Sequence, residues 1–330
     1  MRCRALLLVL LVLLALLLSI SGCAQLASTS TARLMVEPPN RVEPRAWFAN
    51  MRPLRDDQGG FDNRFWVRVG PPAAELLVSL VEPKSADRPP AGTILLLHGA
   101  YERSESKLKP ANALAEGGYR AVLVDLRGHG RSTGSRITYG VREASDLVQV
   151  VDALEERGLL AGRLGVYGFS FGAATAIELA GRDPRVHAVV AVAPYSSLRD
   201  AASHLVRSKI PGAGLFASDQ WVERTMEEAG RRGGFDPRSA TPVAAIRRTK
   251  AMVLLVHGDA DRFIPPYHST LLNRAASDHS QVSIIEGAGH DDLSRDEKGT
   301  AASLALAWFN QWIARRPQTS VRLRGRLPTR

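Results

Sequence analysis

The stretch Gly165-Val-Tyr-Gly168-Phe-Ser170-Phe-Gly172-Ala-Ala decides the fold of this chain. It predicts a buried strand that runs into Gly-x-Ser-x-Gly and then directly into a helix of small residues. Such a sharp turn holds the central serine in a strained backbone conformation and lifts its hydroxyl clear of the sheet. Gly168 and Gly172 leave room where a side chain would collide across the turn. Ser170 is therefore the candidate nucleophile.

Short apolar runs recur on both sides of this turn. The runs that we expect to form strands are residues 65–69, 75–81, 93–97, 121–125, 164–167, 187–192, 252–256 and 282–285. The first two are typical of an antiparallel pair, and helical patterns such as residues 143–157 separate the later ones. This alternation predicts an α/β fold with a mostly parallel, doubly wound, eight-stranded sheet.

The interval from residue 195 to residue 249 breaks the rhythm, because it contains helical pieces and no strand pattern. Four apolar side chains would share one helical face there: Leu215, Val222, Met226 and Ala229. Lids over active sites are often insertions of this kind, so we expect a small helical cap. The alternative is an insertion without a role in the site.

Two later segments supply possible partners for Ser170. One is His257-Gly-Asp259-Ala-Asp261-Arg-Phe-Ile-Pro265, after the predicted strand 252–256, and the other is Glu286-Gly-Ala-Gly-His290, after the strand 282–285. Catalytic groups collect at the carboxyl ends of parallel strands, where all three segments lie. A serine hydroxyl becomes a good nucleophile when a base takes its proton and a third group orients that base.

With these motifs the chain resembles the α/β-hydrolase fold family over about residues 60 to 315, particularly its esterase-like and peptidase-like bacterial members. Ser, Asp, His is the chain order of that family. The resemblance implies that Asp261 is the acid and His290 the base, with Asp259 as the alternative acid. The other histidines are expected to be structural hydrogen-bonding groups near the site (His98, His129) or ordinary surface or loop residues (His257, His268, His279).

Acyl transfer also needs hydrogen-bond donors for the developing oxyanion. The resemblance assigns this role to the backbone N–H groups of Phe171 and of Ala100, in the turn His98-Gly-Ala-Tyr101. The phenol of Tyr101 could donate instead, or its ring could line the pocket. The family's loop at residues 125–134 is interpreted as structural, and no Lys-Ser/Thr ending follows its glycines, which disfavours phosphate binding. Gly165, Gly168 and Gly172 lack Gly-x-Gly-x-x-Gly spacing, so a dinucleotide site is also disfavoured.

The amino terminus is typical of an export signal. Arg2 and Arg4 precede an apolar run at residues 5–18, which is too short to span a bilayer comfortably. Ile20-Ser-Gly-Cys23 resembles the lipobox of bacterial lipoproteins, which implies that residues 1–22 are removed and that Cys23 is acylated. The same resemblance implies that an Asp at the next position would retain the protein in an inner membrane; Ala24 stands there, so an outer-membrane anchor facing the periplasm is expected in a source with two membranes. The alternative is an ordinary cleaved signal that releases a soluble protein.

Composition along the chain indicates the domain boundaries and limits the kinds of partner the protein could have. The proline-containing residues 23–60 are expected to be a tether, residues 61–314 the hydrolase domain, and residues 315–330 a basic disordered tail. Of the net charge of +10, the tail carries six charges and Arg2 and Arg4 two, which leaves +2 for the rest and disfavours nucleic-acid binding. The two cysteines are Cys3 and Cys23, so no disulfide and no metal cluster is expected.

Together these features predict a lipid-anchored serine hydrolase that needs no cofactor and cleaves carboxylic esters through an acyl-enzyme intermediate. A thioesterase, a lipase or an aminopeptidase-like enzyme would use the same residues, because specificity lies in the cap and loops. The alternative from another class is a non-catalytic envelope lipoprotein on a hydrolase scaffold.

Overall fold

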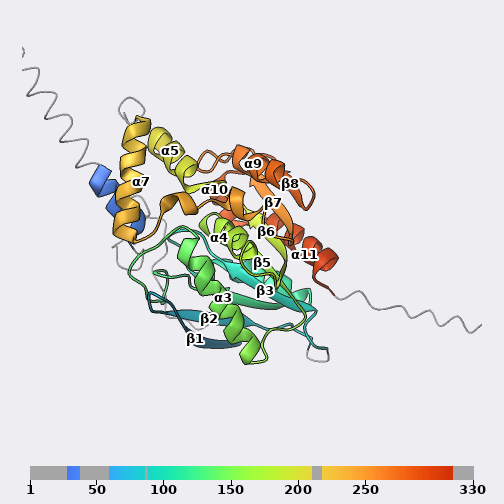
Figure 1. Cartoon of the computed structure of the whole chain (residues 1–330). Coiled ribbons are helices and arrows are strands. Elements are labelled where there is room, and N and C mark those ends of the chain that lie inside the picture. The colour runs from blue at the N-terminus through green and yellow to red at the C-terminus, as the bar shows by residue number, and fades with distance from the viewer. Residues whose placement is uncertain (1–27, 38–58, 86–87, 210–217, 315–330) are drawn as a thin grey trace, which may run out of the picture.

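The computed structural model describes residues 28–37, 59–85, 88–209 and 218–314 (Figure 1). The signal peptide, Cys23, Leu215, most of the expected tether and the basic tail lie outside the described residues.

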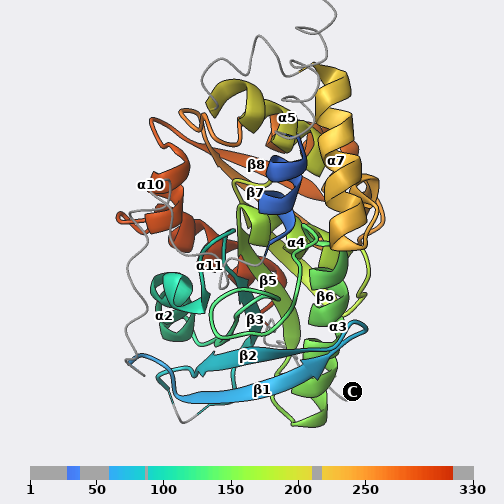
Figure 2. The same ribbon diagram turned by 90° about the vertical axis from the view of Figure 1, so that its left-hand side faces the viewer.

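One twisted sheet of eight strands forms the centre of the described molecule (Figures 1 and 2). The strands, in chain order, are β1 (Asn63–Val69), β2 (Ala74–Val81), β3 (Gly92–Leu97), β4 (Arg120–Val124), β5 (Arg163–Phe169), β6 (Val186–Val192), β7 (Met252–Gly258) and β8 (Ser280–Ile285). Their spatial order is β1-β2-β4-β3-β5-β6-β7-β8. β1 and β2 are antiparallel to their neighbours, and β3 to β8 run parallel. The predicted eight-stranded, mostly parallel sheet is confirmed.

Helices cover both faces of this sheet, which explains why its central strands are apolar throughout. α3 (Val141–Glu156) and α4 (Phe171–Ala180) pack on one face, and α2 (Leu108–Glu116) and α11 (Thr300–Trp312) on the other (Figure 2). α9 (Tyr267–Ala275) shares the apolar core of α3 and α4. In β3, Leu95 and Leu97 belong to the first core, and Ile94 and Leu96 to the second. The parallel strands therefore end together at one edge, where the loops of the candidate site lie.

Helical segments follow β6, and the described residues from 195 to 249 contain no strand. They are α5 (Leu198–Lys209), α7 (Asp219–Gly233), the 3₁₀ turn η4 (Pro237–Ser239) and α8 (Pro242–Ala245). Val222, Met226 and Ala229 are buried on one face of α7, as the helical period predicts. α5 and α7 lie at the end of the molecule away from β1 and β2 (Figure 1). That they act as a cap stays a prediction.

Within the segment expected to be a tether, the described residues 28–36 differ from that expectation. Residues 28–36 form a helix that lies beside α7 (Figures 1 and 2). Ala32 and Val36 are buried in one cluster with Ala229 of α7. A nine-residue helix is marginal in isolation, so this one depends on the apolar face that α7 offers it.

Candidate active site

Ser170 occupies the turn between β5 and α4 with φ 51° and ψ −113°, in the left-handed region that non-glycine residues rarely adopt. The turn can be this tight because Gly168 and Gly172 have no side chains. A Cβ on Gly168 would lie 2.3 Å from the carbonyl oxygen of Gly172, and a Cβ on Gly172 would lie 2.5 Å from that of Leu97. No other residue fits these positions without a backbone shift, so the motif produces the strained serine conformation through its glycines.

The structure brings together the three side chains predicted to do the chemistry. His290 Nε2 lies 3.1 Å from Ser170 Oγ, and His290 Nδ1 lies 2.7 Å from Asp261 Oδ2. The three residues follow β5, β7 and β8, and His290 begins the short helix α10 (His290–Arg295). Ser170 is 8% exposed and Asp261 is 2% exposed, so the hydrogen bonds are largely shielded from water. This is the geometry in which an imidazole can take a proton from a hydroxyl.

Asp261 is held as a carboxylate by the loop that carries it. Its Oδ1 accepts hydrogen bonds from the backbone N–H groups of Phe263 and Ile264, both at 2.8 Å. Burial raises the pKa of Asp261, but hydrogen bonds from His257, from His290 and from the Ile264 N–H outweigh burial and bring the pKa well below its usual range. The negative charge is therefore present throughout the pH range in which His290 can act as a base.

His257 and His268 are not the surface or loop residues expected from the sequence, because both are fully buried. His257 Nε2 lies 2.8 Å from the Ile264 carbonyl oxygen and 3.6 Å from Asp261 Oδ2, and its Nδ1 lies 2.7 Å from Ser269 Oγ. His257 therefore stabilises the loop that carries Asp261, which is called the acid loop below. The signal available in the sequence was the apolar run before His257, which continues as β7 to Gly258.

His268 departs from the expectation through its contacts as well as its burial, whereas His279 lies in a turn, as expected. The Oγ of Ser196 lies 2.9 Å from His268 Nδ1, and burial lowers the pKa of His268 to about 4, so this histidine is neutral. His279 is partly buried, and its Nε2 lies 2.9 Å from the Ile246 carbonyl oxygen. Single histidines without a catalytic motif are expected to be exposed, whereas the side chains of His257 and His268 are buried and that of His279 is partly buried.

Asp259, the alternative acid, is exposed and turned toward a different partner. Its Oδ1 accepts a hydrogen bond from the Gly287 N–H at 2.7 Å, which ties the acid loop to the loop before His290. A turn-stabilising role accounts for this aspartate.

The expected oxyanion donors lie on two rigid elements. Phe171 is the first residue of α4, where backbone N–H groups have no acceptor inside the helix. Ala100 lies in the turn after β3, which His98 stabilises: its Nε2 accepts the Leu126 N–H at 3.0 Å, and its Nδ1 lies 2.8 Å from the Gly99 carbonyl oxygen. Burial lowers the pKa of His98 to about 4, so the imidazole is neutral.

Tyr101 and His129 lie beside this region in supporting positions. Tyr101 has φ 61°, and its phenol oxygen lies 3.5 Å from the Leu34 carbonyl oxygen in the helix 28–36. His129 stacks on the ring of Phe171, with 5.4 Å between the ring centroids. Burial lowers the pKa of His129 to about 3, so it too is neutral.

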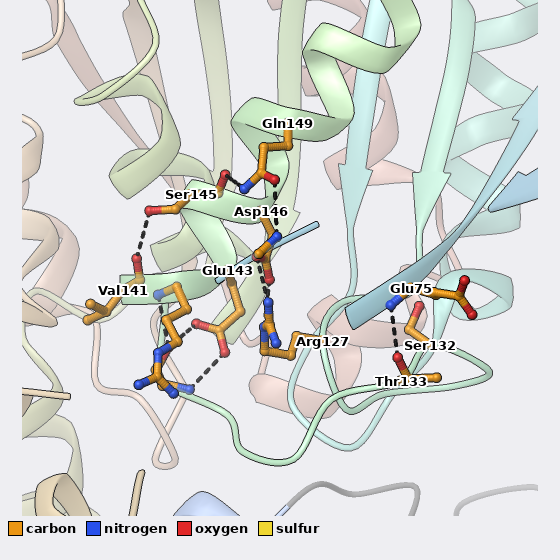
Figure 3. Close-up of polar contacts among 12 residues, drawn as sticks. Glu75, Arg127, Ser132, Thr133, Val141, Glu143, Ser145, Asp146 and Gln149 are labelled. Carbon is orange, nitrogen blue, oxygen red and sulfur yellow. Dashed lines mark hydrogen bonds and ion pairs between the residues drawn. The ribbon is translucent and has the colours of Figure 1, made fainter. Parts of the chain in front are cut away.

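The loop at residues 125–134 forms a fixed base under the site. Asp125 accepts backbone hydrogen bonds from Ser104 at 2.7 Å and Arg131 at 2.9 Å. Arg127 makes two hydrogen bonds of 2.7 Å to Asp146 of α3, and both side chains are buried (Figure 3). These contacts agree with a structural interpretation of the loop.

The described part of the chain contains no group of three or more His, Cys, Asp or Glu side chains arranged to hold a metal ion. None of its helices has the length and apolar character needed to cross a membrane.

Comparisons with known proteins agree with the fold described above. The model of the alpha/beta hydrolase family matches residues 94–302. The uncharacterized protein YqkD of Bacillus subtilis is 27% identical over 202 residues, which cover 60% of this chain and 64% of YqkD, somewhat under two thirds of its length. A monoacylglycerol lipase of Mycolicibacterium smegmatis is 27% identical over 258 residues, covering 68% of this chain and 89% of the lipase.

Among solved structures, an esterase of Pyrococcus furiosus superposes with a TM-score of 0.61 and 18% identity, covering 85% of this chain and 99% of the esterase. At this identity the likeness supports the fold.

Proposed function

Because the chain belongs to the α/β hydrolase family, we propose that it is a serine hydrolase that cleaves carboxylic esters through an acyl-enzyme intermediate. The observation that carries the proposal is the continuous hydrogen-bonded path from Ser170 Oγ through the imidazole of His290 to the carboxylate of Asp261. Its members come from loops far apart in the sequence, and no structural need of the fold requires a strained serine beside an imidazole.

In the proposed first half-reaction, His290 Nε2 takes the proton of Ser170 as Oγ attacks the ester carbonyl carbon. Asp261 holds the imidazole in the Nδ1–H tautomer and stabilises the imidazolium that forms. The N–H groups of Phe171 and Ala100 donate to the oxyanion of the tetrahedral intermediate. When this intermediate collapses, the C–O bond breaks, and His290 gives its proton to the departing alcohol.

In the second half-reaction a water molecule replaces the alcohol. His290 removes a proton from this water, the resulting hydroxide attacks the acyl-Ser170 carbonyl, and a second oxyanion forms at the same donors. Collapse releases the carboxylic acid and returns the proton to Ser170 Oγ. Protein groups supply every proton transfer, so the proposed reaction requires no cofactor.

Esters are favoured as the substrate class on the printed names of two similar proteins, the Mycolicibacterium smegmatis lipase and the Pyrococcus furiosus esterase. Thioester and peptide hydrolysis would use the same groups and are outcomes of the test below. Dehalogenase and epoxide-hydrolase chemistry needs a carboxylate at the nucleophile position, where this chain has Ser170.

The experiment combines covalent labelling with turnover. We expect a fluorophosphonate probe to label the wild-type protein at Ser170, and p-nitrophenyl esters of graded chain length to be hydrolysed. Ser170→Ala should abolish labelling and reduce turnover by at least about 10³-fold. Full turnover by Ser170→Ala would refute the mechanism. A folded wild type that neither labels nor hydrolyses any ester, thioester or peptide would indicate the non-catalytic alternative.

Attachment to the cell envelope is a second, separate proposal, and it rests on the sequence before residue 24. We propose that Cys23 becomes the acylated amino terminus of the mature protein, which would anchor it to the outer membrane. Metabolic labelling with an alkyne fatty acid in a bacterial host should modify the wild type and leave Cys23→Ala unlabelled. Equal labelling of both proteins, or of neither, would contradict the anchor.

A further inference from the structure

Glu102 connects two parts of the candidate site that are separate in the sequence. Its Oε2 accepts a hydrogen bond from the Gly99 N–H at 2.9 Å, in the turn after β3. Its Oε1 accepts a hydrogen bond from Ser294 Oγ, in α10. Gly99 immediately precedes Ala100, an expected oxyanion donor, and Ser294 lies one helical turn after His290. The carboxylate of Glu102 therefore joins the turn that contains Ala100, called the oxyanion turn below, to α10, which begins with His290.

Lys107, at the end of η3 (Ser104–Lys107), completes this connection from below. Its Nζ lies 3.1 Å from Glu102 Oε2 and 3.4 Å from the Ser294 carbonyl oxygen. The same Nζ lies 4.5 Å from the ring centroid of Phe169, the residue before Ser170. That ring in turn lies 5.0 Å from the imidazole of His290, centroid to centroid. The ammonium thus touches the base helix and the serine strand together.

The ion pair between Glu102 and Lys107 is largely removed from solvent, unlike an ordinary surface pair. The Lys107 side chain is 2% exposed and that of Glu102 is 18% exposed, so each charge depends on its partner. Burial raises the pKa of Glu102, but Lys107, Ser294 and the Gly99 N–H outweigh it and lower the pKa to about 2. The carboxylate is therefore ionised at any pH where a serine hydrolase works, and both of its oxygens act as acceptors.

An apolar pair could fill the same volume at no cost in desolvation, and a buried ion pair is weak evidence for stability as such. What an apolar pair could not supply is two directed acceptors, one toward the Gly99 N–H and one toward Ser294. Catalytic groups need placement to within a fraction of an ångström, and an error of about 1 Å can cost about 100-fold in rate. These contacts fix the two elements whose relative placement matters most.

We propose that Glu102 is a positioning residue that sets the oxyanion turn at Ala100 and the base His290 in mutual register, with Lys107 as its counter-ion. The inference rests on the proposed hydrolase function. It also assigns a role to two charged residues for which the sequence motifs give none.

The main test is the double variant Glu102→Leu/Lys107→Met, which removes both acceptors without leaving an unpaired buried cation. We expect kcat on p-nitrophenyl acetate to fall about 10-fold to 100-fold, with KM within about 3-fold of the wild type. The rate constant of fluorophosphonate labelling should fall in parallel, while the final labelled fraction stays complete. That combination separates slow chemistry in a folded site from partial unfolding.

Two further variants complete the test. Ser294→Ala removes only the link to α10 and should lower kcat about 3-fold to 10-fold in a stable protein. Glu105→Leu is the matched control, because Glu105 lies in the same segment, is similarly exposed (21%) and pairs with Arg64 at 3.2 Å. Its kcat should stay within about 2-fold of the wild type if directed contacts are what matter.

A double variant that labels completely at the wild-type rate and keeps its kcat would overturn the positioning role. If the double variant fails to fold, an unchanged kcat in Ser294→Ala overturns it instead, and a reduced one supports it. A wild type that does not react with the probe would overturn the proposed function itself, and with it this inference, which is a visibly different result.

Discussion

Replacing the carboxylate of Asp261 by the amide in Asp261→Asn tests the proposed chemistry most directly. In the native loop Oδ1 accepts two backbone N–H groups, from Phe263 and Ile264, and Oδ2 faces His290 Nδ1. The amide has one oxygen and one NH₂ group for these two positions. Its oxygen is expected to stay with the two backbone donors, so the NH₂ group must point at His290 Nδ1.

This orientation of the amide stabilises the His290 tautomer that cannot act as a base toward Ser170. His290 Nδ1 then accepts from the amide, and the imidazole proton moves to Nε2, which faces Ser170 Oγ and can no longer take its proton. Turning the amide over would restore the tautomer but leave the buried Ile264 N–H and the partly buried Phe263 N–H without their acceptor, at about 1–3 kcal/mol each. A penalty of about 2–6 kcal/mol corresponds to a fall in kcat of about 30-fold to 3 × 10⁴-fold.

The assay is steady-state hydrolysis of p-nitrophenyl acetate by Asp261→Asn and by the matched variant Asp259→Asn, with thermal unfolding of both. We expect KM to change little and Asp259→Asn to keep kcat within about 3-fold of the wild type. A kcat for Asp261→Asn within about 5-fold of the wild type would refute the tautomer argument. A large loss confined to Asp259→Asn would identify that residue as the acid.

Three further predictions concern stability. Arg127→Met should lower the free energy of unfolding by about 3–5 kcal/mol, because it leaves Asp146 buried without its cation. Burial raises the pKa of Asp146 to about 6 even beside Arg127, so its contribution to stability is greatest below about pH 4 and is lost as pH rises through 6. Without Arg127 this pKa rises further, so denaturant unfolding should show a larger deficit at pH 8 than at pH 5, and an equal deficit would contradict the ion-pair explanation. Gly168→Ala should cost about 1–3 kcal/mol or more in thermal unfolding and slow fluorophosphonate labelling, whereas Gly59→Ala, with no atom within 4 Å of the new Cβ, should do neither. Tyr139→Phe removes a 2.7 Å hydrogen bond to the Met35 carbonyl oxygen and should expose the Arg33 bond to trypsin several-fold faster; unchanged cleavage would show that this bond does not hold the helix 28–36.

The fold and the three central side chains could be predicted because their signals are local. Gly168 packs against Gly172 and Ala173, within five residues of sequence, and the central strands are short apolar runs. Gly172 packs instead against Leu97 at the end of β3, so its close contact depends on the completed sheet. Asp261 and His290 follow strands whose carboxyl ends must meet in a parallel sheet. Local sequence patterns, together with the rule that parallel strands end at the same edge of a sheet, were sufficient to predict the fold and these three side chains.

What could not be predicted depends on partners distant in the sequence. The polar residues 28–31 resemble a linker, and only the face of α7, almost 200 residues later, explains why Ala32 and Val36 are buried. Lys107 and Glu102 have the charges of surface residues, and their burial follows from Ser294, equally remote. Such pairings arise from the completed fold, so no local pattern indicates them.

The position of the helix 28–36 has a consequence for how the protein would meet a bilayer. Four residues separate this helix from Cys23, so at full extension the acylated end could reach only about 17 Å from it. A tether of 38 residues could instead have reached about 130 Å at full extension. If Cys23 is acylated as proposed, the molecule would be held by its α7 side, with the Tyr101 turn close to the lipid headgroups, and the lipids of that leaflet would influence its choice of substrates.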